Sequence, residues 1–582
     1  ITKIFLCALL IFTCIIAKLG YEQIFHHTDI MEKALSLWER DFTVAGLRGS
    51  ILDKNGNVLA HDIPSTSVMV VPAQIQDADK IKKPKETAEK LAQVLQGDEQ
   101  KLYETITKHV STQKIQPEGR LISNEQANQL EAMDLEGVYL VQDSLRNYPK
   151  HNYLAQVLGF TGIDNQGLAG LELQYNDVLS AKSGALNIPF DAKGHNVELY
   201  NESYEAPGRG MDVVLTIDSK IQDIVERELN NLVKRYKPKA ALALAMNPKT
   251  GEILAMVSKP DFDPNNYQEY PKEIYNRNLP IWMSYEPGST FKSVTFASAL
   301  DLHLFDMFKD TYLDRGYEMV EGARIKSWKA GGHGLQTFLQ VLENSSNPGF
   351  VEISRRMGLE NLYEYVMRFG FGTKTGVDMP GESSGIMFAK HAMGPVEQAT
   401  VAFGQGISVT PIQLVTAFSA IINGGILYKP YITKSINDPI THDPIVEVKP
   451  TKQRRVISEE TSKQMRYALE SVVANGGGKP AYLEGYQIGG KTGTAQKAEN
   501  GVYSHSNYIL SFLSAAPMND PQIVLYVAAD SPNNDILYGG TVIAPIVKAC
   551  YEDILPYLGI EKVEKQIPKK LVWPETENIV LQ

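Results

Sequence analysis

The hydrophobic and polar positions divide this chain into three kinds of sequence. Residues 4–17 are almost entirely apolar. Residues 21–235 mix short apolar runs with stretches, such as 84–97 and 124–134, in which apolar residues recur at helical spacing. From residue 236 the pattern is more regular, with apolar runs of strand length near both ends of the region and helical spacing between them.

The apolar run at the start lies between Lys3 and Lys18 and indicates a membrane helix. A membrane span needs about 20 residues. The run is shorter, and because the chain begins at Ile1 rather than Met, we expect the segment to be clipped. A signal peptide needs a small-residue cleavage site, which residues 17–19 do not provide, and a core helix would normally show a polar face. We therefore predict a single membrane anchor over residues 1–20, with the rest of the chain on one side of the membrane.

Strand pairs at both ends of the third region predict one α+β domain over residues 236–557. Runs 240–246 and 252–258 flank one turn, runs 508–515 and 523–529 flank another, and 487–496 is a fifth strand candidate. Helical patterns occupy 289–301, 335–344, 411–423, 459–474 and 541–557. We expect an antiparallel sheet closed by the C-terminal hairpin and flanked by helices, and then a C-terminal tail over residues 558–582.

The region before it, residues 21–235, predicts short mixed α/β elements. Asn55-Gly56 lies between apolar runs, which is typical of a tight hairpin. Residues 167–172 begin another helical pattern, and the Pro- and Gly-rich residues 207–210 precede a strand-like run at 212–218.

Composition removes several classes of protein. The chain has 582 residues with 57 basic and 68 acidic side chains, a net charge of −11, and its 43% hydrophobic share excludes wholesale disorder. An acidic chain without basic blocks argues against nucleic acid as a partner. Cys7, Cys14 and Cys550 are too few for a disulfide framework, and no Cys/His spacing indicates a zinc site, so we expect no metal. Cys550 is most simply a core residue.

Ser289 and Lys292 are the first candidates for chemistry. Three residues apart on a helix, they share a face, so the lysine amine can reach the serine hydroxyl. A neutral lysine could take the serine proton, provided that burial or a neighbouring cation lowers its pKa. The same pattern recurs at Ser111 and Lys114, in a polar stretch that predicts a solvated loop. Ser289 follows a Glu-Pro-Gly turn at the start of an apolar helix, where an ordinary serine N-cap fits the residues equally well.

Ser345 and Asn347 supply a second group of polar side chains, at the end of a helical pattern. A hydroxyl and an amide there could bridge a lysine and a substrate amide. The Ser-x-Asn pattern also occurs at residues 435–437 and 531–533, which we interpret as surface loops.

Lys491, Thr492, Gly493 and Thr494 form a third motif, on a predicted strand. The Lys-Thr-Gly triplet also lies in the hairpin turn at 249–251 and in a Gly-rich connection at 374–376, so the triplet alone decides nothing. Only at 491 do strand residues precede it and glycines flank it, which lets another backbone approach. An extended peptide could pair with this edge while the lysine and threonines hold its terminal carboxylate.

In this order and spacing, the three motifs resemble the signatures of penicillin-binding proteins and serine β-lactamases. Segments at 48–49, 209–210, 403–411 and 423–425 resemble class B penicillin-binding proteins, and 404–411 is more similar to their division or sporulation members. The resemblance covers nearly the whole chain. It implies a membrane anchor, a non-catalytic or dimerisation-type pedestal over residues 21–235 and a transpeptidase domain over residues 236–557.

The resemblance implies acyl transfer between peptidoglycan stem peptides during septal or spore cell-wall synthesis. A serine would attack the carbonyl between two terminal D-alanines, and an amine of a neighbouring stem would take the acyl group. A β-lactam would acylate the same serine and remain attached. The implied catalytic residues are Ser289, Lys292, Ser345, Asn347 and Lys491, and the implied substrate-binding residues are Thr492, Gly493 and Thr494. The implied oxyanion hole consists of the backbone N–H groups of Ser289 and Thr494.

Partners and location follow from the same resemblance. Family members work beside a polytopic glycosyltransferase and other division or wall-synthesis membrane proteins. Stem peptides are crosslinked outside the membrane, so we expect a single-pass protein of the cell membrane with its catalytic domain on the extracytoplasmic side. The chemistry needs no metal or organic cofactor.

Other functions share part of this pattern. A β-lactamase or β-lactam sensor has the same motifs, and the Glu-x-x-Leu-Asn pattern of hydrolytic members occurs here at 226–230, where we interpret it as helix surface. A D,D-carboxypeptidase differs only in using water as the acceptor, and the sequence leaves it open. A non-catalytic scaffold for wall synthesis would not need the complete set of Ser289, Lys292 and Lys491.

Overall fold

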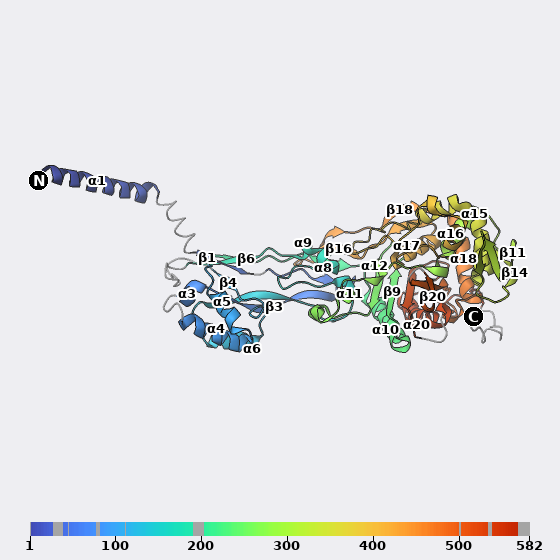
Figure 1. Ribbon diagram of the computed structural model, residues 1–582, viewed down its shortest axis with the longest axis horizontal. Coiled ribbons are helices and arrows are strands. Elements are labelled where there is room, and N and C mark those ends of the chain that lie inside the picture. Colours follow the sequence, from blue (N-terminus) through green and yellow to red (C-terminus); the bar gives the residue numbers. More distant parts are fainter. Residues whose placement is uncertain are drawn as a thin grey trace.

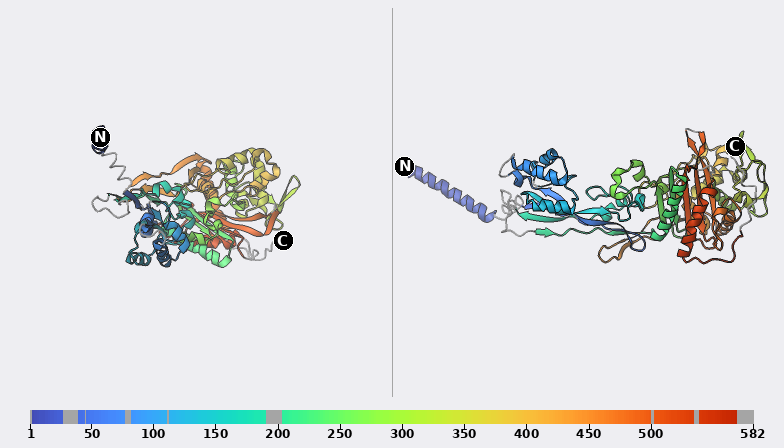
Figure 2. Two further views of the ribbon diagram at one scale, coloured as in Figure 1. Left: turned by 60° about the vertical axis from the view of Figure 1, so that its left-hand side comes forward. Right: turned by 90° about the horizontal axis from the view of Figure 1, so that it is seen from below.

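The computed structural model describes residues 2–26, 39–44, 46–76, 82–110, 112–189, 203–499, 502–533 and 538–568. The molecule is elongated, with an N-terminal helix at one end, a slender β-rich region beside it and a larger α/β body at the other end (Figure 1). The two further views show the same succession (Figure 2). The predicted tail beyond residue 568 lies outside the described residues.

Helix α1 (Thr2–Phe25) is long and apolar enough to cross a membrane. It continues past the apolar run, and its 24 residues extend about 36 Å at 1.5 Å per residue, which exceeds the ~30 Å hydrocarbon core of a bilayer. None of its residues is buried against the rest of the protein. The expected N-terminal apolar helix is therefore present as a candidate membrane anchor.

A seven-stranded sheet connects the slender region to the α/β body. Its strand order is β17-β16-β8-β2-β3-β4, and β5 also pairs with β3. Asn55-Gly56 lies in the turn between β2 and β3, as predicted, with Gly56 at φ +87°. The strands are β2 (Ile51–Leu52), β3 (Val58–Val70), β4 (Gln113–Lys114), β5 (Val138–Asn147), β8 (Asp212–Leu215), β16 (Thr433–Asn437) and β17 (Pro444–Glu447).

The predicted helical segments of the slender region pack against β3 and β5. Helices α4 (Lys82–Leu95) and α6 (Asn124–Ala132) correspond to the expected helices at 84–97 and 124–134, and α5 (Glu99–Ile106) lies between them. Their apolar faces form one buried cluster with Val68 and Val70 of β3. This cluster lies at the end of the slender region nearer α1 (Figure 1).

Two arginines and two acidic residues are buried together at the centre of the slender region. Arg48 Nε lies 2.6 Å from one carboxylate oxygen of Glu172, and Arg146 Nε lies 2.7 Å from the other. Arg146 also pairs with Asp62 at 3.1 Å, and all four side chains are at most 2% exposed. Removing one partner from such a network leaves a buried charge uncompensated. The network therefore fixes how β3, β5 and helix α8 (Gly170–Gln174), which carries Glu172, meet.

The five predicted strands of the α/β body form one antiparallel sheet in the order β10-β9-β21-β20-β19. The C-terminal hairpin of β20 and β21 lies between β9 and β19, which confirms the expectation that this hairpin closes the sheet. The bounds are β9 (Ala240–Met246), β10 (Ile253–Lys259), β19 (Gly489–Glu499), β20 (Val502–Ala516) and β21 (Ile523–Asp530).

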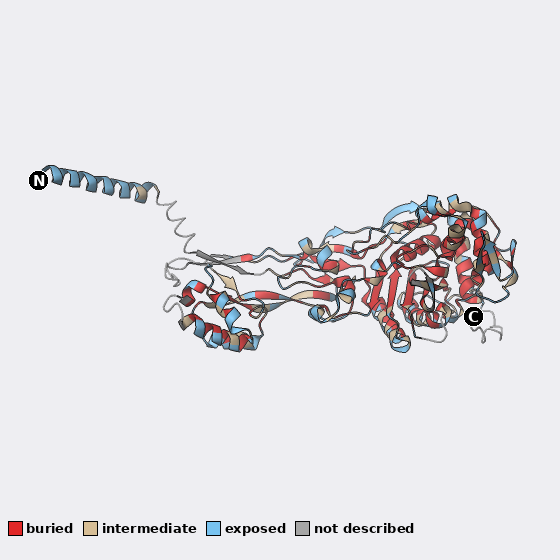
Figure 3. Cartoon of the chain, in the orientation of Figure 1, coloured by how far each residue is buried: buried red, intermediate tan, exposed pale blue. Residues whose placement is uncertain are grey.

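Helices cover both faces of this sheet, and the alternation along β9 shows why. Leu242 and Leu244 belong to the buried cluster that includes residues of α13, α17 and α18, whereas Ala241 and Ala243 belong to the cluster that includes α10 and α20. Successive residues of a strand face opposite sides of the sheet. Buried residues accordingly run through both layers (Figure 3). The helices are α10 (Ser219–Tyr236), α13 (Lys292–Asp301), α17 (Pro411–Ile422), α18 (Glu459–Asn475) and α20 (Ala544–Tyr557).

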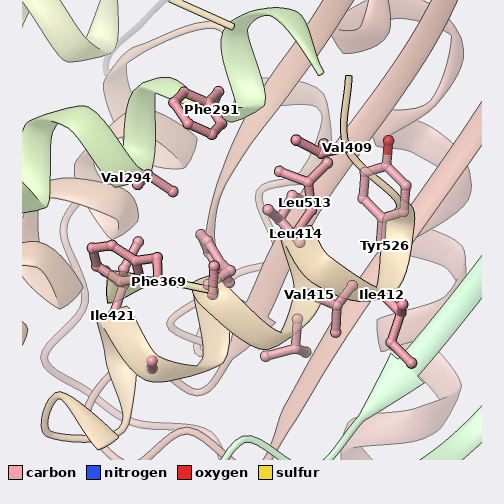
Figure 4. Close-up of a cluster of buried hydrophobic side chains, with 14 of the residues drawn as sticks. Phe291, Val294, Phe369, Val409, Ile412, Leu414, Val415, Ile421, Leu513 and Tyr526 are labelled. Atoms are coloured by element: carbon pink, nitrogen blue, oxygen red, sulfur yellow. The ribbon is translucent and has the colours of Figure 1, made fainter. Parts of the chain in front are cut away.

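Helix α17 lies at the centre of the larger cluster. All of its 12 residues are buried, and its apolar side chains lie between the sheet and the segment around Phe291 and Val294 (Figure 4). Cys550 is buried in the other cluster, which confirms its interpretation as a core residue. Both faces of the sheet in the α/β body are thus covered by closely packed side chains.

Three expectations from the sequence were wrong in detail. The helix expected from residue 289 starts as a short 3-10 turn, η2 (Gly288–Thr290), and α13 begins only at Lys292. Residues 435–437, expected in a surface loop, lie in β16, because this segment pairs with β8 more than 200 residues earlier in the chain. Lys114, expected in a solvated loop, lies in the short strand β4, while Ser111 lies outside the described residues.

Candidate active site

The turn that carries Ser289 is fixed by a glycine-rich loop packed beneath it. Gly288 has φ +54°, and its N–H donates to the Gly404 carbonyl oxygen at 3.0 Å. A Cβ on Gly404 would lie 2.2 Å from the Gly288 oxygen, so only glycine allows this approach. The Thr290 hydroxyl donates to the Pro287 carbonyl oxygen at 2.8 Å and closes the turn from the other side.

Ser289, Ser345 and Lys292 form a continuous chain of polar contacts. The hydroxyl oxygens of Ser289 and Ser345 are 3.1 Å apart, and Ser345 Oγ lies 3.1 Å from Lys292 Nζ. Lys292 Nζ also donates to the Ser345 carbonyl oxygen at 2.7 Å and to Asn347 Oδ1 at 2.6 Å. A neutral amine has two N–H groups and one lone pair. With both N–H groups directed at these two acceptors, its lone pair can receive the Ser345 proton, and Ser345 can in turn receive that of Ser289.

The surroundings of Lys292 favour its neutral form. The side chain is completely buried, and its Nζ lies 5.2 Å from the centre of the Phe350 ring. Burial, together with the nearby positive charge of Lys491, holds the pKa of Lys292 well below its usual range. The sequence required burial or a neighbouring cation to lower the pKa of this lysine, and the structure provides both.

The loop that carries Ser345 is held in a backbone conformation that few residues adopt. Ser345 has φ +54°, which is uncommon for a residue other than glycine. The neighbouring Ser346 donates from its hydroxyl to Asp314 Oδ2 at 2.8 Å, and Trp328 Nε1 donates to the Asn344 carbonyl oxygen at 2.7 Å. Asn347 then begins helix α15 (Asn347–Arg368). These contacts on both sides hold the Ser345 hydroxyl toward Ser289.

Asp314 and Trp328 belong to a segment of short strands that the sequence analysis missed. The strands are β11 (Thr311–Asp314), β12 (Tyr317–Val320), β13 (Ala323–Lys326) and β14 (Gly334–Thr337). Four-residue strands carry too short an alternation to be recognised with confidence from sequence. His333 lies in this segment with its ring edge-on to that of Trp328, and the two ring centres are 5.3 Å apart.

Lys491 lies on β19, the edge strand of the sheet, and is 1% exposed. Burial lowers its pKa to about 7. A Cβ on Gly493 would lie 2.4 Å from Ser511 Oγ and 3.0 Å from Thr290 Cγ2, so this glycine lets β19 pack directly beside the turn that carries Ser289. Thr494 Oγ1 accepts from the Gly539 N–H at 3.3 Å. Within the described ranges no strand pairs with the outer edge of β19.

The other copies of these motifs lie elsewhere. Lys249 is in the turn between β9 and β10 and pairs with Asp520 at 2.6 Å, and Thr375 of the second extra triplet bonds to Glu382.

Glu226, interpreted as helix surface, does lie on α10 but pairs with Lys259 at 3.1 Å and is only 12% exposed, so that interpretation was wrong for this side chain. Throughout the part of the chain that the structure describes, no group of three His, Cys, Asp or Glu side chains could hold a metal ion.

Known domain families match both main parts of the chain. Residues 43–215 match the Penicillin-binding Protein dimerisation domain, and residues 241–552 match the Penicillin binding protein transpeptidase domain. The chain belongs to the penicillin-binding protein transpeptidase family.

Individual relatives of this penicillin-binding protein agree. The chain is 50% identical over 576 residues to Stage V sporulation protein D of Bacillus subtilis (strain 168), covering 99% of this chain and 88% of that protein. It is 28% identical over 577 residues to the probable peptidoglycan D,D-transpeptidase PenA of Neisseria gonorrhoeae, covering 96% and 93%. Penicillin Binding Protein 2X from Streptococcus thermophilus shares the fold, with a TM-score of 0.72 at 24% identity over 90% of this chain and 81% of that one. The family and the multidomain α+β fold expected from the sequence are confirmed.

Proposed function

We propose that this penicillin-binding protein is a serine-type peptidoglycan D,D-transpeptidase that crosslinks stem peptides through an acyl-enzyme on Ser289. The observation that carries the proposal is the chain of contacts from Ser289 through Ser345 to the buried Lys292, beside Lys491. A nucleophile, a proton relay, a buried amine base and a cation on an open strand edge are the parts that acyl transfer between peptides requires.

In the first half-reaction, Ser289 Oγ attacks the carbonyl carbon between the two terminal D-alanines. Its proton passes to Ser345 while the proton of Ser345 passes to Lys292, so that the C–O bond forms as the amine becomes an ammonium ion. The N–H groups of Ser289 and Thr494 stabilise the oxyanion, and one such donor typically contributes about 2.7–4 kcal/mol. The C–N bond then breaks, and the proton returns along the same chain to the departing amine of D-alanine.

In the second half-reaction, an amine of a neighbouring stem peptide attacks the ester carbonyl. The amine gives up a proton to the Ser345–Lys292 pair, a new amide bond forms, and Ser289 leaves with a proton returned from Lys292. A β-lactam follows only the first half, because its opened ring stays joined to the acyl group and keeps the position of the acceptor occupied.

The donor peptide would lie along β19 as an added strand. Lys491 and the hydroxyls of Thr492 and Thr494 would hold its terminal carboxylate, and Gly493 would let the two backbones approach. The Asn347 amide would orient the substrate amide while its oxygen keeps Lys292 in place. Each of these residues then has a role in either proton transfer or substrate alignment.

The cellular role, location and partners of the protein are also proposed from its family. The relative that is 50% identical carries the name of a sporulation protein, which supports a role in spore or septal wall synthesis. We propose that α1 anchors the protein in the cell membrane as a single-pass protein, with the catalytic domain on the extracytoplasmic side. The slender pedestal would contact a polytopic glycosyltransferase and other wall-synthesis membrane proteins.

Acylation by penicillin with peptide mapping tests this function. The full-length protein in detergent is incubated with fluorescent penicillin, and mass spectrometry of the digest should locate the adduct on Ser289. Ser289→Ala should abolish labelling, and Lys491→Ala should slow it, whereas Lys374→Ala, in a second Lys-Thr-Gly triplet, should leave it unchanged. Labelling of Ser289→Ala as strong as that of the natural protein would refute the proposal.

A second assay separates transpeptidation from the alternatives. With a stem peptide ending in two D-alanines and an excess of an amine acceptor, the protein should form the crosslinked product in addition to free D-alanine. Hydrolysed donor without crosslinked product would indicate a carboxypeptidase. Acylation by penicillin without turnover of the peptide would indicate a sensor, and no acylation at all would indicate a scaffold.

A further inference from the structure

Glu286, three residues before Ser289, bonds to two segments far from it in the chain. Its Oε1 accepts a hydrogen bond from the Gly406 N–H at 2.9 Å and a second from the Tyr503 hydroxyl at 3.1 Å. Its Oε2 is buried and has no hydrogen-bond partner within the described part of the chain. Burial also raises the pKa of this carboxyl group. A buried polar atom without a partner needs an explanation, and a role in the neighbouring site is one.

The first of these segments supports the nucleophile. Gly406 belongs to the loop whose Gly404 carbonyl accepts from Gly288, directly before Ser289. Glu286 therefore bonds to the same loop from the other end of the turn. The turn carrying the nucleophile is held to residues 404–406 on both sides.

The second segment is the outer part of the β19–β20 hairpin. Tyr503 lies opposite Ala498, near the hairpin tip, whereas β20 pairs with β21 only from Ile509 onward. In this outer part β19 and β20 pair only with each other, with a register shift between Gln496 and Ala498, and an isolated two-stranded hairpin is marginally stable at best. The hydrogen bond from Tyr503 to Glu286 ties this outer part to the nucleophile turn.

We propose that Glu286 and Tyr503 form a clasp that positions the substrate-binding strand β19 against Ser289. The two residues are positioning residues, since they act through β19 and the nucleophile turn. The clasp ties the outer part of the hairpin that carries Lys491–Thr494 to the turn that carries Ser289, so that an added peptide strand is held in register with the hydroxyl. The inference rests on the proposed function, because it takes β19 as the strand that binds the donor peptide.

The clasp should control the acylation step more than initial binding. Lys491 and the two threonines that would hold the carboxylate lie where β19 pairs with the part of β20 that β21 also pairs with, so their positions depend less on the clasp. The distance between Ser289 and the carbonyl carbon, however, depends on how the strand and the turn are held together. Misplacement of reacting groups by about 1 Å can cost 100-fold in rate.

Stopped-flow acylation by fluorescent penicillin tests the clasp. Tyr503→Phe removes only the hydroxyl, and Glu286→Ala removes the carboxylate. Each should lower the limiting acylation rate about 5- to 20-fold, with the apparent dissociation constant changed less than twofold. The double variant should be no slower than Glu286→Ala alone, because both changes break the same contact. Glu286→Gln, whose amide oxygen can still accept both bonds, should restore most of the rate.

Tyr467→Phe, at an exposed tyrosine on α18, is the matched control and should behave like the natural protein. An effect on the dissociation constant alone, or losses that multiply in the double variant, would overturn the proposal. If Glu286→Ala does not fold, the comparison of Tyr503→Phe with Tyr467→Phe decides the question. A rate for Tyr503→Phe within twofold of the natural protein would then refute the clasp.

Hydrogen exchange gives a readout that does not depend on penicillin. In Tyr503→Phe, amides of the hairpin between residues 496 and 508 and of the nucleophile turn should exchange at least fivefold faster, whereas β9 and β21 should not change. Unchanged exchange at the hairpin would overturn the clasp whether or not penicillin acylates the protein. Absence of acylation in the natural protein would instead contradict the proposed function.

Discussion

The hydroxyl oxygens of Ser289 and Ser345 lie 3.1 Å apart, although 55 residues separate them in the chain and neither hydroxyl belongs to the body of a long helix. Ser345 reaches this position through a left-handed backbone conformation supported from the strand segment 311–337. The pair places a second hydroxyl between the nucleophile and Lys292. Ser345 therefore connects Ser289 to the amine through two contacts of 3.1 Å each.

Ser345→Ala should lower the rate of acylation by penicillin about 10²- to 10⁴-fold, the usual contribution of a positioned proton-transfer group. The alanine removes the relay while leaving the Lys292 contacts to the Ser345 carbonyl and to Asn347. Second-order acylation rates measure the effect. Ser531→Ala, in another Ser-x-Asn pattern, should be neutral. A loss of less than fivefold in Ser345→Ala would show that Ser289 and Lys292 exchange the proton directly.

The rate of acylation should follow a bell-shaped pH profile. Lys292 acts as a base only when neutral, so the rate should rise as pH increases through its lowered pKa. Lys491 holds the carboxylate only when charged, so the rate should fall as pH increases through its pKa of about 7. Acylation rates measured between about pH 5 and 10 give both limbs of the curve.

Lys491→Ala should change this profile in a specific way. The charge of Lys491 is one of the causes that lower the pKa of Lys292, so its removal should shift the acid limb to higher pH. The alkaline limb should disappear, and the maximal rate should fall because the carboxylate has lost its partner. An acid limb at the same pH in both proteins would mean that the two lysines do not interact.

Glu172→Gln should destabilise the pedestal. The change leaves Arg48 and Arg146 buried with weakened partners, and breaking a buried pair typically costs 3–5 kcal/mol. Urea unfolding monitored by intrinsic fluorescence measures the loss in the free energy of unfolding. Asp553→Asn breaks a pair whose two side chains are about half exposed and should cost about 0–1 kcal/mol. Equal effects of the two changes would contradict the importance assigned to the buried network.

Gly404→Ala should slow acylation by at least tenfold. Its Cβ would lie 2.2 Å from the Gly288 carbonyl oxygen, and the position has φ +83°, so the nucleophile turn must move. Gly322→Ala is a matched control, because Gly322 has φ +85° and nothing lies within 4 Å of its Cβ position. Both changes should carry a similar backbone cost, and only Gly404→Ala should lower the acylation rate.

The sequence predicted the central sheet of the catalytic half because its signals are local. Strand β9 alternates large and small apolar residues, and the turn after it contains Asn, Pro and Gly. Residues 435–437 gave no such signal. Their strand forms only by pairing with β8, and pattern analysis of one segment contains no information about a partner so distant in the chain.

The candidate site was predicted unevenly for a similar reason. The spacing of Ser289 and Lys292 gives their proximity directly, since both lie on one turn of chain. Ser345 and Lys491 occur in patterns that are repeated elsewhere in the sequence, and local context together with the order of the three motifs distinguished these copies from the others. Glu286 and Tyr503 carried no sequence signal, because their contact depends on where the tip of a hairpin lies.

The sheet shared by the two halves of the chain also makes the pedestal and the catalytic body move as one unit. Strands β16 and β17 follow the catalytic motifs around Ser289 and Ser345 in sequence, yet they extend the sheet of β8 and β2 in the pedestal. Backbone hydrogen bonds between strands therefore join the pedestal to the catalytic body, and the pedestal is a stiff spacer. A displacement of the pedestal would therefore carry the catalytic body with it, because strands of both belong to the shared sheet.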